Sequence, residues 1–292
     1  MTTAAVAYII AAAVTAAMLY VILRLFPKFK IYNIYALTIN YATASITSLV
    51  SGSGFSEVSF LQAKDFLVPA FLIGALFISI FYTSARCAQL CGVSITSIAA
   101  KMSMVIPITA AAFLFDDRFS VWKIAGIIIA IAAVYFSAPK NNNTTSTGRY
   151  WFLPLIVFVG SGLVDTAVKI AQHYYINESN EKVFISMLFF GAGCIGLVSS
   201  IINFINNRIP LSVTTVIGGI ILGITNYYSL YFLVKALAVK GIESSLVFSL
   251  VNLLVVVMSA VIAFTAFHEK SDARRRTGLA LAFIAIILLY FR

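Results

Sequence analysis

The sequence predicts an all-α membrane protein with ten transmembrane helices, arranged as two inverted five-helix repeats. Three observations lead to this prediction: the apolar composition, the length of the apolar runs, and glycines and charges that recur at a constant distance along the chain. Hydrophobic residues make up 61% of the 292 positions and charged residues 10%, whereas a soluble domain carries about 25% charged residues. Because so few charges cannot cover a water-facing surface, we expect the chain to lie in lipid.

Apolar runs of roughly 20 residues, long enough to cross a hydrocarbon core of about 30 Å, give the expected helices in order. The first five are residues 3–25, 32–50, 66–86, 92–115 and 121–138, and the second five are 151–174, 183–205, 213–237, 242–267 and 277–291. The run 32–50 is the most polar, because it carries several Asn, Thr and Ser residues. We therefore expect this helix to face protein or water rather than lipid on every side.

A polar segment, 140–149 (KNNNTTSTGR), divides the chain into two halves, 1–139 and 150–292. Residues of the same kind recur in both halves at one offset (223 − 74 = 149): Gly74 and Gly223, Tyr82 and Tyr231, Arg86 and Lys235, Gly92 and Gly241. Further along, Asp117 and Glu269 and then Gly126 and Gly278 recur at a second offset (278 − 126 = 152). This recurrence predicts a duplication. Since five is an odd number, the second half must enter the membrane from the opposite side, as in many secondary transporters.

A resemblance to a known family rests on three motifs between residues 96 and 136. They are SMVIPIT around Pro107, FLFDDR around Asp117, and WKIAG ending at Gly126, followed in the second half by AFHEK at Glu269 and GLALA from Gly278. These motifs resemble the repeat signature of the EamA-type drug/metabolite transporter superfamily. The resemblance implies ten helices, alternating access, and export or exchange of small metabolites such as amino acids, sugar phosphates, nucleotide sugars or drugs. Val256 stands where the offset of 149 places the partner of Pro107, so the two repeats need not bend alike.

Three charged residues lie deep in the expected helices: Lys101, Asp165 and Lys169. A charge at the centre of a membrane helix costs about 2.5–3.5 kcal/mol, so each needs a partner, water or a task. Asp165 and Lys169 are four residues apart and can pair on one helix face. If Asp165 neutralises one lysine, a positive charge remains, which favours an anionic or zwitterionic solute. The alternative is that Lys101 and Asp165 form an interhelical pair that only locks the bundle.

Uncharged polar residues complete the predicted substrate-binding set. Asn252 belongs to a polar stripe with helical spacing, which suits a cavity wall and helix packing equally. Asn226 and Tyr231 follow Gly219 and Gly223, whose G-x-x-x-G spacing lets a neighbouring helix approach closely. Tyr82, the repeat partner of Tyr231, could likewise line a pocket, although tyrosine also populates the membrane interface.

The orientation in the membrane stays open. Clusters of Lys and Arg follow the expected first helix (Arg24, Lys28, Lys30) and ninth helix (Lys270, Arg274, Arg275, Arg276). By the positive-inside rule they would put both termini outside. The family resemblance implies instead that both termini face the cytoplasm. We expect an integral protein of the plasma (inner) membrane of a prokaryote.

The expected function is secondary transport of a small-molecule substrate, with membrane lipid as the other partner. Coupling to protons through Asp165, exchange and uniport are all open. A membrane scaffold or sensor with the same fold is the alternative. We expect no enzyme, cofactor or metal, because three cysteines and two histidines give no zinc or hydrolase spacing. We expect no nucleic-acid partner, because the Lys and Arg residues lie mainly at the ends of apolar runs.

Overall fold

The computed structural model describes residues 3–51, 64–114, 120–139, 148–175, 181–239, 244–269 and 272–290. Within these ranges the chain forms helices and no strands. The helices are α1 (Thr3–Leu25), α2 (Asn33–Ser51), α3 (Lys64–Leu90), α4 (Val93–Met102), α5 (Val105–Leu114), α6 (Val121–Ser137), the short 3-10 turn η1 (Gly148–Tyr150), α7 (Leu153–Tyr175), α8 (Glu181–Asn207), α9 (Val213–Leu237), α10 (Ser244–Thr265) and α11 (Ala273–Tyr290).

Seven segments of the described chain are long and apolar enough to cross a membrane. They lie in α1, α3, α4 with α5, α7, α8, α9 and α10. Of the remaining helices, α2 is rich in polar residues, α6 has 17 residues, and α11 begins with three consecutive arginines. The chain is therefore an all-α membrane protein, as the composition predicted.

The segment 92–115, predicted as one helix, is two helices, and this is a correction to the sequence-based expectation. The helix ends at Met102, and α5 begins at Val105. Pro107 explains the break, because it has no N–H to donate to the carbonyl of Ser103 and its ring crowds that carbonyl. The N–H of Ile106 donates to the Ser103 oxygen instead, at 2.9 Å. In the second half, where Val256 replaces the proline, α10 runs without a break.

The contacts group the described chain into two compact units, which are described separately. Unit 1 comprises residues 1–24, 83–163 and 228–292, and unit 2 comprises residues 25–82 and 164–227. Each unit therefore contains helices from both predicted halves, 1–139 and 150–292. A division by contacts does not test the predicted division by repeat, and the predicted linker falls mostly outside the described residues.

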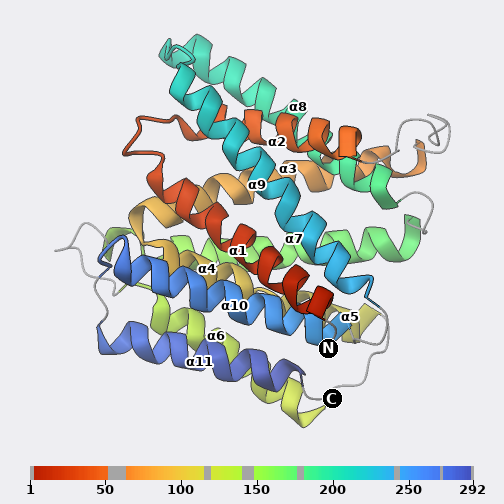
Figure 1. Ribbon diagram of the computed structural model, residues 1–292, viewed down its shortest axis with the longest axis vertical. Coiled ribbons are helices and arrows are strands. Elements are labelled where there is room, and N and C mark those ends of the chain that lie inside the picture. Colours follow the sequence, from red (N-terminus) through yellow and green to blue (C-terminus); the bar gives the residue numbers. More distant parts are fainter. Residues whose placement is uncertain are drawn as a thin grey trace. The chain divides into compact units, whose positions relative to one another are not determined.

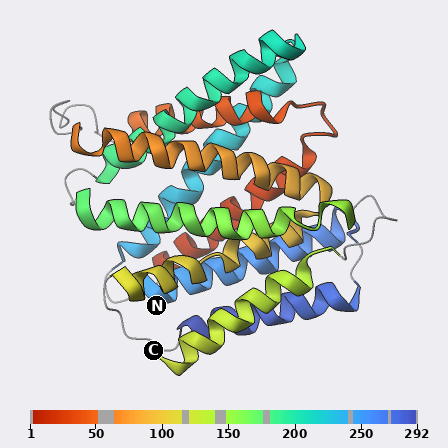
Figure 2. The same cartoon turned by 180° about the vertical axis from the view of Figure 1, so that it is seen from behind.

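In unit 1, α6 and α11 pack along each other, as both views show (Figures 1 and 2). A Cβ placed on Gly278 would lie 2.7 Å from the backbone nitrogen of Ser137, and one on Gly126 would lie 2.8 Å from Cγ of Leu289. These two contacts are reciprocal, because Leu289 follows Ser137 by the offset that separates Gly278 from Gly126 (289 − 137 = 278 − 126 = 152). The helices run antiparallel, since a higher number on α6 meets a lower number on α11.

In unit 2, the polar helix α2 packs along α8, and a second pair of reciprocal contacts occurs. A Cβ on Gly74 would lie 2.7 Å from the nitrogen of Ala192, and one on Gly223 would lie 2.7 Å from Cβ of Thr43. The offset is the same on both sides (223 − 74 = 192 − 43 = 149). Gly219, the other glycine of the G-x-x-x-G spacing, would place its Cβ 2.8 Å from the carbonyl oxygen of Ala36. The close approach predicted for these glycines is confirmed.

Hydroxyl pairs also join α2 to α8. The side chains of Thr38 and Ser200 are 2.9 Å apart, and those of Ser48 and Ser186 are 3.0 Å apart. The rising numbers on α2 meet falling numbers on α8, so these helices too are antiparallel. The polar residues of α2 therefore face protein, as expected for a helix too polar to meet lipid all round.

The apolar cores lie within the units. In unit 1, one core joins α3, α4, α5, α6, α7, α10 and α11, and a second joins α1 to α10 and the end of α9. In unit 2, a smaller core joins α3, α7 and α8.

Candidate functional site

The predicted substrate-binding residues fall in both units. Lys101, Tyr231 and Asn252 belong to unit 1, and Tyr82, Asp165, Lys169 and Asn226 belong to unit 2.

Lys101 and Asn252 lie close to the break between α4 and α5. Lys101 is half-buried near the end of α4, at the centre of the apolar segment Val93–Ala110. Asn252 projects from α10, and its side-chain nitrogen lies 3.5 Å from the sulfur of Met104, which stands in the break. Because α4 and α10 pack against each other, the break combines an interrupted backbone, a cation and an amide. Interrupted membrane helices of this kind form the solute sites of many secondary transporters.

Tyr231 forms part of an aromatic cluster on α9. Its ring meets Phe232 edge to face with centroids 5.5 Å apart, and Tyr228 similarly at 6.0 Å. The ammonium group of Lys235 lies 5.6 Å from the centroid of the Tyr231 ring, a geometry that favours a cation–π contact. One face of the Tyr231 ring, a predicted substrate-binding group, is thus occupied by the Lys235 ammonium group from the same helix.

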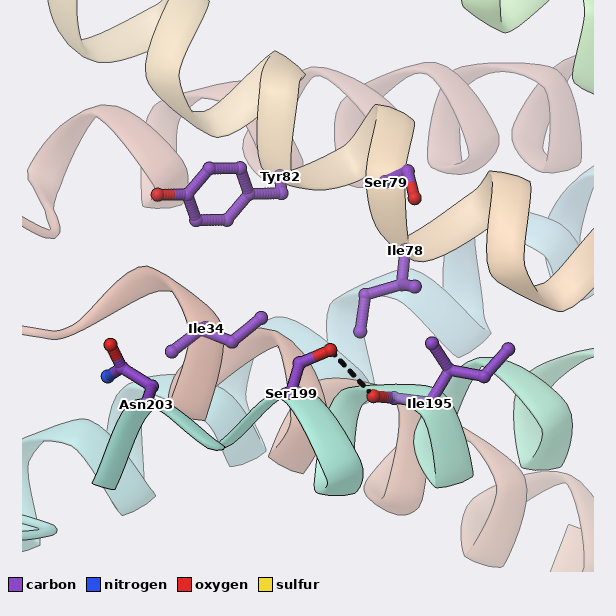
Figure 3. A pocket seen from close by; sticks show the side chains of 7 residues that line it. All are labelled: Ile34, Ile78, Ser79, Tyr82, Ile195, Ser199 and Asn203. Atoms are coloured by element: carbon purple, nitrogen blue, oxygen red, sulfur yellow. Dashed lines mark hydrogen bonds between the residues drawn. The ribbon is translucent and has the colours of Figure 1, made fainter. Parts of the chain in front are cut away.

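A groove lies between α2, α3 and α8 within unit 2 (Figure 3). It has a volume of about 460 Å³, within the range of about 300–1,000 Å³ of small-molecule pockets. Its lining consists of Ile34, Ile78, Ser79, Tyr82, Ile195, Ser199 and Asn203. None of these described lining residues is charged, so the groove suits an uncharged group of moderate polarity.

One end of the groove is the more polar. Figure 3 shows the Tyr82 hydroxyl and the Asn203 amide towards this polar end, and Ile78, Ile195 and the Ser79 hydroxyl towards the other. The hydroxyl of Ser199 donates to the carbonyl of Ile195 at 2.8 Å, so its oxygen can only accept from a bound molecule. The Tyr82 hydroxyl makes no hydrogen bond to the described residues and can donate to one.

Asn203 is held in place by its neighbours at the polar end of the groove. Its amide nitrogen donates to the hydroxyl of Tyr35 at 3.3 Å, and its oxygen accepts from the amide of Asn207 at 2.7 Å. The Tyr35 hydroxyl in turn donates to the carbonyl of Ile209 at 3.1 Å. Such a chain of hydrogen bonds fixes the orientation of the amide that faces the groove.

Asn226, Asp165 and Lys169 do not line this groove. The Asn226 amide donates to the side-chain oxygen of Asn40 at 3.3 Å, which ties α9 to α2. Asn40 is fully buried, and its own amide nitrogen makes no hydrogen bond to the described residues. Asp165 and Lys169 have exposed side chains on α7. Their role in binding stays a prediction.

Comparisons with known proteins find a likeness in sequence and a likeness in fold, each over nearly the whole chain. The chain is 26% identical to an uncharacterized protein of Haemophilus influenzae over 277 residues, which are 93% of this chain and 93% of that protein. A protein of known crystal structure superposes with a TM-score of 0.59 over 95% of this chain and 96% of its own, at 13% identity. At such an identity the likeness concerns the fold alone. No known protein family matches the sequence.

Sequence reasoning missed most of the groove. Ser79, Ser199 and Asn203 were not singled out, although Ser199 and Asn203 stand four residues apart on one face of an apolar helix. That spacing was the available signal. In the part of the chain that the structure describes, no three His, Cys, Asp or Glu side chains gather where they could hold a metal ion.

Proposed function

We propose that the chain is a secondary transporter that exports or exchanges a small polar metabolite by alternating access, with ten spanning helices in two inverted five-helix repeats. The observation that carries this proposal is the pair of reciprocal glycine contacts. Gly126 and Gly278 in unit 1 contact two residues, one in each half, that correspond to each other at the same sequence offset as the glycines. Gly74 and Gly223 do the same in unit 2.

Reciprocity of this kind is what a twofold rotation produces. When residue i contacts residue j of a rotated copy, residue j contacts residue i of the original. Here the copies lie in one chain, and the offsets of 149 and 152 measured from the contacts equal those measured from the sequence. The paired helices α2 with α8 and α6 with α11 are antiparallel, which supports a copy that was turned over. Alternating access follows from such an arrangement, because one bundle can rock against the other.

The solute is proposed to be anionic or zwitterionic because of Lys101. A lysine at the centre of an apolar segment is costly, and this one precedes by three residues Met104 in the helix break, whose sulfur lies 3.5 Å from the side-chain nitrogen of Asn252. A carboxylate or phosphate would neutralise the ammonium group, and the amide can accept or donate to a second polar group. The neutral groove at Tyr82 would receive an uncharged part of a solute.

The resemblance to EamA-type transporters gives the proposed family, and the plasma (inner) membrane of a prokaryote is the proposed location. The full-length likeness to a bacterial protein supports a bacterial setting. Proton coupling through Asp165 is a further element of the proposal.

Counterflow in proteoliposomes tests the function. Vesicles preloaded with unlabelled compound are offered the labelled compound, in a panel of acidic metabolites, amino acids and nucleotide derivatives. We expect counterflow of at least one anionic or zwitterionic compound, reduced about tenfold or more by Lys101→Ala and unaffected by Lys28→Ala, which replaces an exposed lysine in the turn after α1. Full transport by the Lys101→Ala variant would remove the site assignment.

The alternative, a scaffold or sensor without a transport path, predicts a different labelling pattern. Single cysteines introduced at Lys101 and Asn252, after replacement of the three native cysteines, would react with a water-soluble maleimide in a transporter. In a scaffold without a water-filled path both would stay unreactive, and counterflow would be absent.

A further inference from the structure

The corner between α10 and α11 docks on the N-terminus of α4, within unit 1. The side chain of Glu269, in the segment between the two helices, reaches the start of α4, where its Oε1 accepts a hydrogen bond from the backbone N–H of Val93 at 2.7 Å. Only 5% of this side chain is exposed. The carboxylate thus caps a ten-residue helix whose first N–H groups have no partner within the helix.

Gly92 makes room for this contact. Its φ of 118° lies in the region that favours glycine, and a Cβ placed there would lie 2.5 Å from Oε2 of Glu269. The backbone of the corner also favours this contact. His268 has a left-handed conformation, and the N–H of Glu269 donates to the carbonyl of Ala263 at 2.9 Å. The backbone at Gly92 and the backbone of the corner therefore both allow the Glu269 side chain to reach α4.

The second carboxylate oxygen is left without a hydrogen bond. Oε2 of Glu269 is buried and has no hydrogen-bond partner among the described residues. The guanidinium of Arg275 on α11 lies 3.8 Å from this oxygen, a distance too long for a hydrogen bond. A buried carboxylate oxygen that accepts no hydrogen bond is costly as an anion, and it is the position at which a proton would bind.

The other charged and titratable groups around Glu269 come from three further elements. Arg24 of α1 donates to the carbonyls of Ala88 and Gln89 at the end of α3, and Arg275 donates to the carbonyl of Cys91 at 3.1 Å. The thiols of Cys87 and Cys91 lie in the same region. Both guanidinium groups thus donate to backbone carbonyls, and the Arg275 nitrogen lies 3.8 Å from Oε2 of Glu269.

Burial has a larger effect on the pKa of the Glu269 carboxyl than these cations have. It raises the pKa of the Glu269 carboxyl above the ordinary value, while the Val93 N–H, Arg275 and Arg24 oppose the rise. Glu269 lies between α10 and α11 and outside both helices.

We propose that Glu269 is a proton-binding site that fastens the α10–α11 corner to the N-terminus of α4, so that proton uptake favours the docked corner and proton release favours its separation. This proposal goes beyond the transport function and does not depend on it, because docking is measurable whether or not a solute moves. If the transport proposal also holds, proton binding at Glu269 would affect the position of Lys101, because Lys101 lies on the same short helix, eight residues after Val93 (101 − 93 = 8).

Cys91 supplies a reporter for the docked state. Its side chain is 3% exposed beside the corner, and its sulfur lies 3.5 Å from the carbonyl oxygen of Tyr150. In a Cys87→Ala, Cys194→Ala background it is the single thiol of the protein. The rate of maleimide labelling is measured on the full chain in nanodiscs from about pH 5 to about pH 8. Division by the rate for the same protein unfolded in detergent removes the intrinsic pH dependence of the thiol.

The corrected rate is expected to increase about fivefold or more as the pH rises. Glu269→Gln, which keeps the capping oxygen but cannot titrate, should give a flat profile. Asp272→Asn is the matched control, because it removes an exposed carboxylate three residues away that caps α11 through the N–H of Arg275 at 3.0 Å. It should leave the profile of the parent protein unchanged.

A second variant keeps the proposal testable if Glu269→Gln does not fold. Arg275→Gln removes a cation that favours the carboxylate, so the midpoint of labelling should move to higher pH. A flat profile in the parent protein, an unchanged slope in Glu269→Gln, a lost slope in Asp272→Asn, or a midpoint in Arg275→Gln that stays in place or moves to lower pH would each overturn the proposal. Counterflow does not enter this experiment, so its outcome is separate from that of the transport test.

Discussion

Gly278 of α11 lies so close to Ser137 of α6 that a Cβ on the glycine would stand 2.7 Å from the serine's backbone nitrogen. The Ala133 carbonyl oxygen is the next backbone atom, at 3.0 Å. Backbone atoms cannot turn away, so Gly278→Ala should force the helices apart and lower the free energy of unfolding by about 1–3 kcal/mol. Thermal unfolding in detergent measures this loss.

Gly126→Ala should cost less than Gly278→Ala, because the first atom its Cβ meets is Cγ of the Leu289 side chain, at 2.8 Å, and a side chain can rotate. Gly193→Ala on α8 is the matched control. Its Cβ would meet nothing nearer than 3.7 Å, and alanine is favoured over glycine in a helix by about 0.5–1 kcal/mol. Equal losses in all three variants would contradict the close packing.

Gly92→Ala should be among the most damaging single substitutions, because it combines an unfavourable φ with a clash against Glu269. We expect a loss of about 3 kcal/mol or more in the free energy of unfolding. Adding Glu269→Ala should restore part of that loss by removing the clash but not the strain, so the two substitutions should not be additive. Strict additivity in this double-mutant cycle would show that the side chains do not meet.

Stability should depend on pH through Glu269. Because burial raises the pKa of this carboxyl in the folded protein, the folded state holds a proton that the unfolded state has already lost. The contribution is fully present below the ordinary pKa of 4.5 and is lost as the pH rises through the raised value. Unfolding temperatures across this range should fall less steeply in Glu269→Gln than in the parent protein, and a steeper fall in the variant would reverse the sign.

Tyr82→Phe tests the groove without altering its shape. The hydroxyl has no hydrogen bond to the described residues, so its removal should leave thermal unfolding unchanged. If a solute accepts from it, the half-saturation concentration for counterflow should rise about five- to tenfold, the equivalent of roughly 1–1.4 kcal/mol. Tyr135→Phe, on the exposed side of α6, should change neither quantity. A Tyr82→Phe protein with unaltered transport would remove this residue from the binding set.

Pro107 and Val256 offer a matched pair of substitutions at equivalent positions. Pro107→Ala should leave stability nearly unchanged, because the helix is already interrupted and the alanine N–H gains the Ser103 carbonyl as an acceptor. Val256→Pro should cost about 3 kcal/mol, since this fully buried residue stands inside the continuous helix α10. Circular dichroism and thermal unfolding distinguish the two, and a larger loss for Pro107→Ala would contradict the origin of the break.

The sequence predicts helix boundaries well where a long apolar run meets strongly polar flanks. The expected spans 3–25 and 213–237 coincide with α1 and α9, because hydrocarbon length fixes how many apolar residues a helix needs. The sequence does not predict the break after Met102, even though Pro107 belongs to one of the motifs. A proline within the first turn of a helix is compatible with a continuing span or with a break, and tertiary contacts decide between them.

The candidate site was less predictable than the fold. Lys101 and Asn252 were singled out because polar groups are costly in lipid, and both lie near the break. The serines of the groove escaped notice because one hydroxyl in an apolar helix can be satisfied by its own backbone, as Ser199 is by Ile195. Glu269 was recorded only as part of a repeated motif. Its partner Val93 is 176 residues away, a separation that no local pattern reveals, and Asp117, its counterpart in the first half, lies outside the described residues.

The capping of α4 by Glu269 also means that α4 is synthesised well before the residue that caps it. Helix α4 leaves the ribosome with its first N–H groups unsatisfied, and the acceptor arrives only after 176 further residues have been made. Until then this helix end must keep contact with water or with lipid headgroups. A nascent chain that stops before Glu269 therefore lacks this acceptor, and we expect such truncated chains to be recognised by quality-control proteases at the start of α4.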